Sequence, residues 1–318
     1  MYENKKFAIK LDVIIPVFNE EECLHELMKR LLSVCAYWED GSFNLIFVND
    51  GSNDLSLDIL LQYANNSKHI KIINLSRNFG HQIAMTAGLN FSNADFVVII
   101  DADLQDPPEL IIDLYKKALT GYDVVYAQRT DRQGESIFKK LSAKLFYRFL
   151  SKLSNVHIPQ DVGDFRIVSK RVVKNINEMT ERHRYIRGMI PWLGFKSTFI
   201  GYHREKRFSG KTKYSLNKMI NFSKDAIFSF TDFPLRLSFY IGTRILIFAL
   251  IGTCIIVYLR LFTSYTVPGI STVIILILFM GGLQIFIIGI IGEYIARIYE
   301  ETKNRPLYIV SSKINFDK

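Results

Sequence analysis

The sequence predicts an α/β domain built on a mostly parallel sheet, followed by a hairpin of two transmembrane helices. One observation is that apolar runs of strand length alternate with helix-like stretches in the N-terminal part, which is typical of a parallel sheet covered on both faces. The other is that the stretch from Phe239 to Ile291 is almost wholly apolar, interrupted only by the polar turn SYTVPG. Because a hydrocarbon core requires about 20 apolar residues per helix, this stretch holds two spans, near Ser238–Arg260 and Ile270–Gly292.

The expected strands of the N-terminal domain are, in order, DVIIPVF, NLIFVND, KIINL, DFVVII and DVVYA. Helices are expected from Glu20 to about Ala36, after Ser52, around Gln82–Phe91 and after Pro107. Polar clusters follow four of the strands, namely NEEE, NDGSND, DADLQD and QRTDR. Since ligands of parallel α/β sheets bind at the carboxyl ends of the strands, these clusters predict a nucleotide-type site there.

Two further segments are expected to lie on the membrane surface. In residues 137–153, basic side chains recur every four residues along one face and apolar side chains line another, which is typical of an interfacial helix. A solvated helix packed on the sheet is the alternative for this segment. The chain is therefore divided into an α/β domain over residues 1–212, a juxtamembrane amphipathic helix over 213–235, two spans within 236–295 and a C-terminal tail over 296–318.

The formal net charge of +9 favours an anionic partner, either nucleic acid or a membrane surface. The apolar spans favour the membrane and no nucleic-acid-binding signature is present, so we expect a lipid bilayer and no nucleic acid as partner. Charged residues flank both ends of the apolar stretch and almost none lie in its loop, which predicts that both termini are cytoplasmic. Cys23, Cys35 and Cys254 lack the spacing of a disulfide framework or a zinc site, as suits a reducing compartment.

The stretch DADLQDPPE contains acids with two different expected roles. Asp106 precedes two prolines and lies three residues before Glu109, a pattern typical of a helix N-cap, so we interpret these two acids as structural. Asp101 and Asp103, with Gln105, fall on one face of a strand end. Two neighbouring carboxylates repel unless a cation lies between them, and a hard divalent cation commonly bridges carboxylates to substrate phosphates. The spacing therefore predicts a metal site.

The segments VIIPVFNEEE, VNDGSND, SRNFG, DADLQDPPE and VGDFRIVSKR resemble the GT-A glycosyltransferases of family 2, in particular the polyprenyl-phosphate branch that includes dolichol-phosphate mannose synthase. The two spans, ending in GEYIARIYEETKNRPLY, are similar to those of the bactoprenol (undecaprenyl-phosphate) glucosyltransferases. This resemblance implies a Rossmann-like GT-A catalytic domain, a divalent metal (Mg²⁺ or Mn²⁺), a nucleotide-sugar donor and a polyprenyl phosphate acceptor. It also implies a multi-pass protein of the bacterial inner membrane with its catalytic domain in the cytoplasm.

The resemblance further implies the residues of the site. Those expected to bind the nucleotide are Pro16, Glu20, Asp50, Asn78, Gly80 and Asp101. Those expected to hold the metal and the diphosphate are Asp101, Asp103 and Gln105. Those expected to bind the acceptor phosphate are Arg129, Arg166, Arg207, Lys211 and Lys213. Asp103, Asp164 and Arg129 are expected to be catalytic.

Several of these residues also have a structural interpretation. Asp50 suits the turn NDGS, Arg129 suits an ordinary surface position, and the loop RFSGKTKYS suits solvent. Asp164 is open between a base, a ligand of the sugar or acceptor, and a structural partner of Arg166. No role is assigned to His81. Asp164 replaces the small residue usual in the mannose synthase branch, which favours the bacterial glucosyl-type branch.

The expected reaction transfers glucose from UDP-glucose to the polyprenyl phosphate on the cytoplasmic leaflet. A phosphate monoester is largely dianionic at neutral pH, so the acceptor supplies its own nucleophile and a single displacement inverts the anomeric carbon. Transfer of GlcNAc, galactose, mannose or an amino sugar stays open, as do a non-catalytic nucleotide-sugar-binding membrane protein and a homo-oligomer. A processive polysaccharide synthase is disfavoured because the chain lacks a Q-x-x-R-W signature and further spans.

Overall fold

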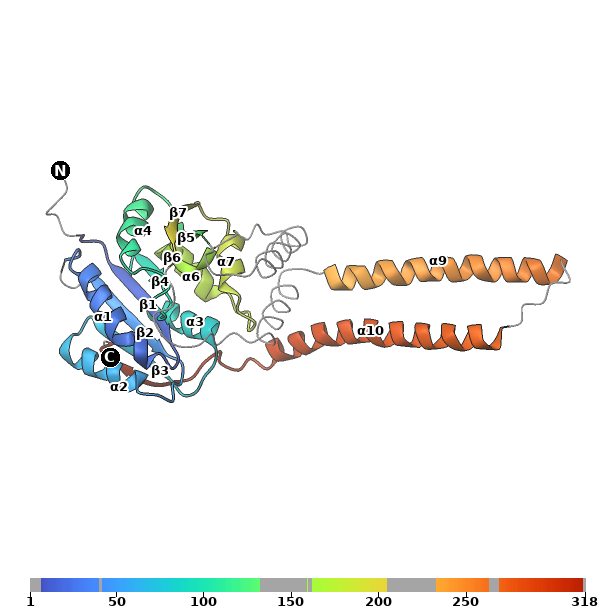
Figure 1. Cartoon of the computed structure of the whole chain (residues 1–318), viewed down its shortest axis with the longest axis horizontal. Coiled ribbons are helices and arrows are strands. Elements are labelled where there is room, and N and C mark those ends of the chain that lie inside the picture. The colour runs from blue at the N-terminus through green and yellow to red at the C-terminus, as the bar shows by residue number, and fades with distance from the viewer. Residues whose placement is uncertain are drawn as a thin grey trace. The chain divides into compact units, whose positions relative to one another are not determined.

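The computed structural model describes residues 7–39, 42–131, 159, 162–204, 233–262 and 269–316 of the chain. The chain divides into two compact units. One unit holds the sheet together with the residues from Arg305 onward, and the other holds two long helices (Figure 1). Residues 137–153 and most of 213–235, expected to form the interfacial helices, lie outside the described residues.

The first unit is built on an eight-stranded sheet in the order β7-β5-β6-β4-β1-β2-β3-β8 (Figure 1). Strands β1, β2, β3 and β4 are mutually parallel, β5 and β7 are parallel to each other, and β6 runs antiparallel to both β4 and β5. The strands are β1 (Leu11–Val17), β2 (Phe43–Asn49), β3 (Ile70–Leu75), β4 (Phe96–Ile99), β5 (Val124–Asp131), β6 (Val162–Ser169), β7 (Ser197–His203) and β8 (Val310–Ile314). The predicted mostly parallel α/β fold is confirmed.

Helices cover both faces of this sheet because its central strands are apolar on both sides. Leu11, Val13 and Ile15 of β1 pack in one core with the apolar faces of α1, α2 and α4. Ile14 points the other way, against α3, where Gly88 leaves the room that its side chain needs. The helices of this unit are α1 (Glu21–Cys35), α2 (Ser56–Asn66), α3 (His81–Phe91), α4 (Leu110–Ala118), α6 (Lys170–Glu178) and α7 (Ile186–Trp192).

Strands β6, β7 and β8 are not predicted by the alternating pattern, and β6 matters most for the site. Strand β6 enters the sheet between β4 and β5, and its register pairs Ile99 with Arg166. Continued by two residues, this antiparallel register sets Asp164 opposite Asp101. The insertion therefore brings an acid from a distant part of the chain to the carboxyl end of β4.

The expected N-cap of α4 is wrong. The helix begins at Leu110, and no side chain caps its first turn. Glu109 instead accepts two hydrogen bonds from Arg30 on α1, from Nε at 2.8 Å and from Nη2 at 2.6 Å. Asp106 is fully buried and accepts a hydrogen bond from the Tyr202 hydroxyl. Both acids thus serve tertiary contacts, which outweigh the local capping preference.

The second unit consists of α9 (Phe233–Phe262) and α10 (Ile270–Thr302). Within the described residues these are the two helices long and apolar enough to cross a membrane, with candidate spans at Phe233–Gly252 and Phe279–Thr302. They overlap the two expected spans. Length and composition alone support the assignment.

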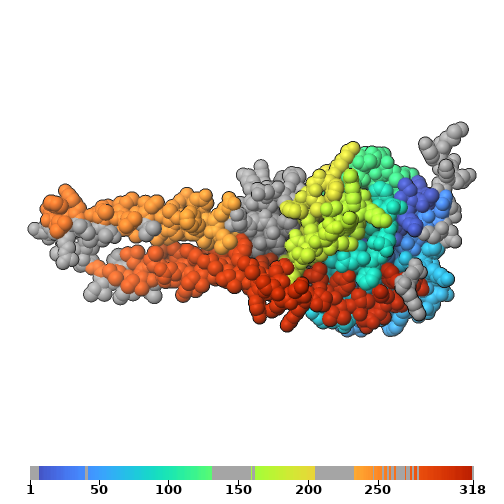
Figure 2. Space-filling model, turned by 180° about the vertical axis from the view of Figure 1, so that it is seen from behind, coloured from blue at the N-terminus to red at the C-terminus, as the bar shows by residue number. Residues whose placement is uncertain are grey.

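The C-terminal residues return to the sheet instead of forming a separate tail. Strand β8 pairs antiparallel with β3, and Asn315 Nδ2 contacts the carbonyl oxygens of Ala64, Ser67 and Ile70 at 2.8, 3.1 and 2.9 Å. Figure 2 shows the red C-terminal residues on the surface of the sheet-containing unit. Segments that precede and follow the two long helices in the chain therefore share one sheet.

The turn after β2 supplies a test of the packing at the strand ends. Gly51 has φ +68°, and a Cβ there would lie 2.5 Å from the carbonyl carbon of Arg77. Gly194 has nearly the same φ, +69°, with open space around it. Gly194→Ala should lower the free energy of unfolding by about 1 kcal/mol, the strain of the left-handed backbone. Gly51→Ala should lower it by about 2 kcal/mol more, because the backbone of the next loop must move.

The measurement is the thermal unfolding midpoint of both variants in detergent, beside the wild-type protein. Equal midpoints for the two variants would show that the close approach of the loops at Gly51 does not stabilise the fold.

Candidate active site

The loops that follow β1 and β2 are joined to each other by reciprocal hydrogen bonds. The Asn19 N–H donates to Ser52 Oγ at 3.0 Å, and the Asn53 N–H donates to Asn19 Oδ1 at 2.8 Å. The Leu55 N–H donates to Glu21 Oε2 at 2.8 Å. Many polar side chains of the NEEE and NDGSND clusters therefore join the two loops at the carboxyl ends of the strands.

Asp50 holds the next loop in place. Its two carboxylate oxygens accept the backbone N–H groups of Phe79 and Gly80 at 2.7 and 2.9 Å. Burial raises the pKa of Asp50 and these N–H groups partly offset it, so the pKa is above its ordinary value. This geometry matches the turn-building interpretation of Asp50. The predicted nucleotide-binding role of Asp50 stays a prediction, as do those of the buried Pro16, the half-buried Glu20 and Gly80, and the exposed Asn78.

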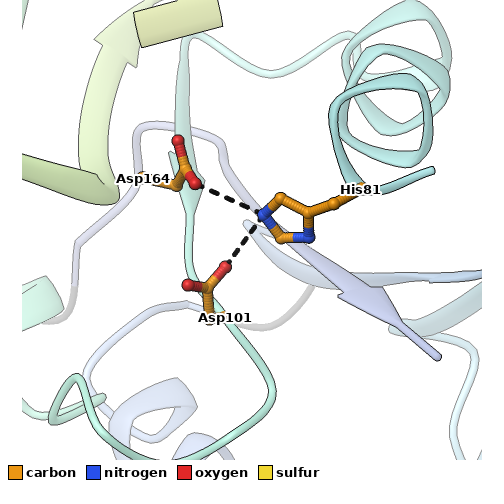
Figure 3. A group of neighbouring side chains, drawn as sticks. All are labelled: His81, Asp101 and Asp164. Carbon is orange, nitrogen blue, oxygen red and sulfur yellow. Dashed lines mark hydrogen bonds and ion pairs between the residues drawn. The ribbon is translucent and has the colours of Figure 1, made fainter. Parts of the chain in front are cut away.

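Three side chains from three different elements meet at the carboxyl end of β4 (Figure 3). His81 is the first residue of α3, and its Nε2 lies 3.2 Å from Asp101 Oδ1 and 3.3 Å from Asp164 Oδ2. Asp101 follows β4, and Asp164 comes from β6. Asp101 and Asp164 were predicted site residues, and the structure brings them together through a histidine to which the sequence analysis assigns no role.

Arg187 of α7 completes this group, which we name the charge cluster: His81, Asp101, Asp164 and Arg187. The Arg187 guanidinium donates from Nε to Asp164 Oδ1 at 2.8 Å and from Nη2 to Oδ2 at 2.6 Å. Burial opposes ionisation of Asp164, but Arg187 and His81 outweigh it and hold the pKa of this carboxyl well below its ordinary value. Burial likewise opposes protonation of His81, but Asp101 and Asp164 raise the pKa of the imidazole well above its ordinary value.

These contacts limit what Asp164 can do chemically. Both of its oxygens are engaged and its pKa is low, so it is a weak proton acceptor. Arg166 is also buried beside it, donating to the carbonyl oxygens of Asp164 at 3.1 Å and Gly163 at 2.5 Å and lying over the ring of Tyr126. This position favours a structural role for Arg166 over contact with an acceptor phosphate.

Asp103 and Gln105 lie on the loop after Asp101. The buried Asp103 accepts the Gln105 N–H at Oδ1, at 3.2 Å. Among the described residues, the group of three acids or histidines close enough to share a cation is His81, Asp101 and Asp164, with ligand atoms within 4.8 Å of one another. Asp103 is not a member of it.

The residues at the strand end fit a divalent cation. Asp101 Oδ1 is buried and receives no well-directed hydrogen bond, although His81 Nε2 lies 3.2 Å away. A buried carboxylate oxygen without a directed donor is the kind of atom that a cation completes, and oxygen is the ligand that hard divalent cations prefer.

Arg129 lies at the end of β5, beside the charge cluster. Its Nε donates to the Tyr202 hydroxyl at 3.4 Å, and a Cβ on Gly163 would lie 2.6 Å from its Nη2. The predicted phosphate ligands Arg207, Lys211 and Lys213 lie outside the described residues.

Several polar side chains of this region have no role predicted from the sequence, namely His81, Arg187, Tyr202 and Arg204. His81 directly follows the motif SRNFG, a signal that could have identified it. Arg187 stands in no recognisable motif, and only its hydrogen bonds to Asp164 in the folded structure reveal its place in the site.

Acids and hydrogen-bonded turns at the carboxyl ends of the strands are typical of α/β proteins that bind a nucleotide there. Residues 12–176 match the family described as Glycosyl transferase family 2, and the chain belongs to this family. It is a glycosyltransferase. An uncharacterized glycosyltransferase, YkcC, from Bacillus subtilis is 44% identical over 97% of this chain and 95% of its own length.

Two other relatives have more specific names. A prophage bactoprenol glucosyl transferase homolog from Escherichia coli is 38% identical over 95% of this chain and 98% of its own length. The bactoprenol glucosyl transferase of Shigella phage SfX is 37% identical over 96% of this chain and its entire length, 100%.

The pairing of Arg187 with Asp164 is testable against a second ion pair of the same form. Arg187→Ala should lower the free energy of unfolding by about 3 kcal/mol, because it removes a partner of a buried charge. The displaced Asp164 should reduce sugar transfer by about 100-fold. Arg171 makes a similar two-point pair with buried Asp123 at the start of β5, so Arg171→Ala is the matched control.

Initial transfer rates and thermal unfolding midpoints distinguish the two pairs. Arg171→Ala should keep transferring sugar. Wild-type rates for Arg187→Ala, or an equal loss in both variants, would show that the Arg187–Asp164 pair has no special part in the reaction.

Proposed function

We propose that the protein transfers glucose from UDP-glucose to undecaprenyl phosphate or a similar polyprenyl phosphate in the bacterial inner membrane. The observation that carries the proposal is the extent of similarity to the bactoprenol glucosyl transferases. The family 2 match ends at residue 176, whereas the relatives named for this activity align over 95–96% of the chain. The similarity therefore includes the two long apolar helices, which suit an acceptor that resides in lipid.

The chemical task is to bring two anions together, the donor diphosphate and the acceptor phosphate. A divalent cation, Mg²⁺ or Mn²⁺, held by Asp101 and Asp103 with Gln105 beside them, would neutralise charge on the departing diphosphate. Arg129, with Arg207, Lys211 and Lys213, would hold the acceptor phosphate by charge-assisted hydrogen bonds.

The acceptor needs no strong base, because its phosphate is largely dianionic at neutral pH. Asp164 therefore serves to orient the sugar or the acceptor, in keeping with its engaged oxygens and low pKa. A single displacement inverts the anomeric carbon, so an α-linked donor yields a β-linked lipid. Positioning and charge stabilisation supply most of the acceleration.

The chain path supports a cytoplasmic active site with both termini on the same side. Strands β1 and β8 belong to one sheet, although α9 and α10 lie between them in the chain. If these two helices cross the membrane, they must cross it as a hairpin, since an odd number of crossings would separate β8 from β3. The charged flanks of the apolar stretch favour the cytoplasm as that side.

The proposed activity has a direct assay. Membranes that contain the protein, incubated with undecaprenyl phosphate and a panel of radiolabelled nucleotide sugars, should move label from UDP-glucose into the organic phase. EDTA and Asp103→Asn should each reduce this transfer by at least about 100-fold, because the diphosphate loses its counter-charge. Asp113→Asn, an exposed acid on α4, is the control and should leave transfer unchanged.

Transfer of label from a different sugar nucleotide would overturn the choice of glucose and keep the enzyme class. Wild-type transfer in EDTA or by Asp103→Asn would overturn the metal role.

The membrane topology is tested by cysteine labelling in intact cells. In a variant without Cys23, Cys35 and Cys254, a single cysteine at position 264, between the helices in sequence, should react with an impermeant maleimide from outside. A single cysteine at the exposed Lys313 of β8 should react only after lysis. The opposite pattern would place the sheet outside the cytoplasm.

A further inference from the structure

Asp106 is a buried acid for which neither helix capping nor the chemistry described so far supplies a role. It is fully buried, accepts a hydrogen bond from the Tyr202 hydroxyl and lies 3.8 Å from Arg204 Nε. Burial opposes the charge of Arg129, but Asp106 and Tyr202 outweigh it and raise the pKa of the Arg129 guanidinium. Burying a carboxylate is strongly unfavourable unless cations and hydrogen-bond donors compensate it, so these partners explain how the chain tolerates Asp106.

The Tyr202 hydroxyl connects Asp106 to Arg129. It donates to Asp106 and accepts from Arg129 Nε at 3.4 Å, and the sheet register pairs the two residues directly, Arg129 on β5 with Tyr202 on β7. The Tyr202 ring is buried edge-on against Phe165, at 6.1 Å between ring centres. Burial and the charge of Asp106 raise the pKa of Tyr202, so its hydroxyl keeps the proton that it donates.

Gly163 leaves room for the Arg129 guanidinium on the side away from Tyr202. A Cβ at position 163 would lie 2.6 Å from Arg129 Nη2, so the guanidinium occupies space that only glycine leaves open. Gly163 directly precedes Asp164 of the charge cluster. The Arg129 guanidinium therefore lies between Tyr202 and Gly163, at the same end of the sheet as the charge cluster.

The charges do not balance among these residues. Asp106 supplies one negative charge to two arginines, and Arg204 Nε is buried without a hydrogen bond within the described part of the chain. The undirected Arg204 donor and the two guanidinium groups suit an anion with several oxygens. Paired guanidinium groups match a phosphate by charge and by geometry.

We propose that Asp106 and Tyr202 are positioning residues that hold Arg129 and Arg204 as a paired guanidinium site for a phosphate monoester. Arg204 is a phosphate ligand of this site in addition to those expected from the sequence. The identification of the monoester with the polyprenyl phosphate rests on the proposed function. The site itself rests on the contacts of Asp106, Tyr202 and Gly163.

The test is equilibrium binding of farnesyl phosphate and, separately, of UDP to the full-length protein in detergent. Arg204→Ala should raise the Kd for farnesyl phosphate by about tenfold, the effect of losing one charge-assisted hydrogen bond. Asp106→Asn and Tyr202→Phe should each raise it by about as much, because they release the arginines from the positions in which they bind the phosphate. The Kd for UDP should change by less than about twofold, within ordinary variation for a site that is not altered. Farnesol, which lacks the phosphate, should bind all forms equally.

Asp123→Asn is the matched control. Asp123 is also a buried acid paired with an arginine, Arg171, but it precedes β5 and so lies at the opposite end of the strand from Arg129. Its replacement should reduce stability and leave both Kd values unchanged. Tyr202→Phe removes only a hydroxyl, so it keeps the test decisive if Asp106→Asn fails to fold.

Three results would overturn the inference. One is equal weakening of farnesyl phosphate and UDP binding, and another is an effect of Asp123→Asn as large as that of Tyr202→Phe. The third is a wild-type protein that does not bind farnesyl phosphate. Selective weakening of farnesyl phosphate binding by a protein that transfers no sugar would overturn the proposed function and leave the phosphate site standing.

Discussion

The buried carboxylate of Asp164 is the constraint on which the arrangement of the site depends. A charge with 1% of its surface exposed is tolerable only with close partners, and Arg187 and His81 supply them from α7 and α3. Through His81 the same interaction reaches Asp101 after β4. Side chains from α3, α7, β6 and the loop after β4 are thus joined by one set of charges.

At the ends of β1 and β2, acidic side chains also hold segments together, here by accepting backbone N–H groups. Asp50 ties the turn after β2 to the start of α3, and side chains of the first turn accept N–H groups of the second. Acids in these turns therefore stabilise the backbone that lines the site. Strand β8 is the edge strand beside β3. The residues that follow α10 in the chain thus belong to the sheet of the catalytic unit.

Periodicity was enough to predict β1 to β5 in order and the helices between them, because apolar strands and amphipathic helices leave local patterns. It could not predict β6, whose antiparallel insertion is a long-range choice, or β8, which follows two apolar helices. The same holds for the site. Asp101 is predictable from its position at a strand end, whereas Arg187 is recognised only by its hydrogen bond to Asp164 in the folded protein. At Asp106 the local N-cap pattern was misleading, because a tertiary hydrogen bond from Tyr202 engages the acid.

The central claim is that Asp101 of the charge cluster and Asp103 beside it hold a divalent cation where the donor diphosphate binds. Electron paramagnetic resonance of Mn²⁺, titrated into purified protein with UDP present, tests it without reference to turnover. The account predicts saturable Mn²⁺ binding by the wild type, competed by Mg²⁺, and an affinity reduced by at least about tenfold in Asp101→Asn. Equal Mn²⁺ affinity in the wild type and in Asp101→Asn would contradict it.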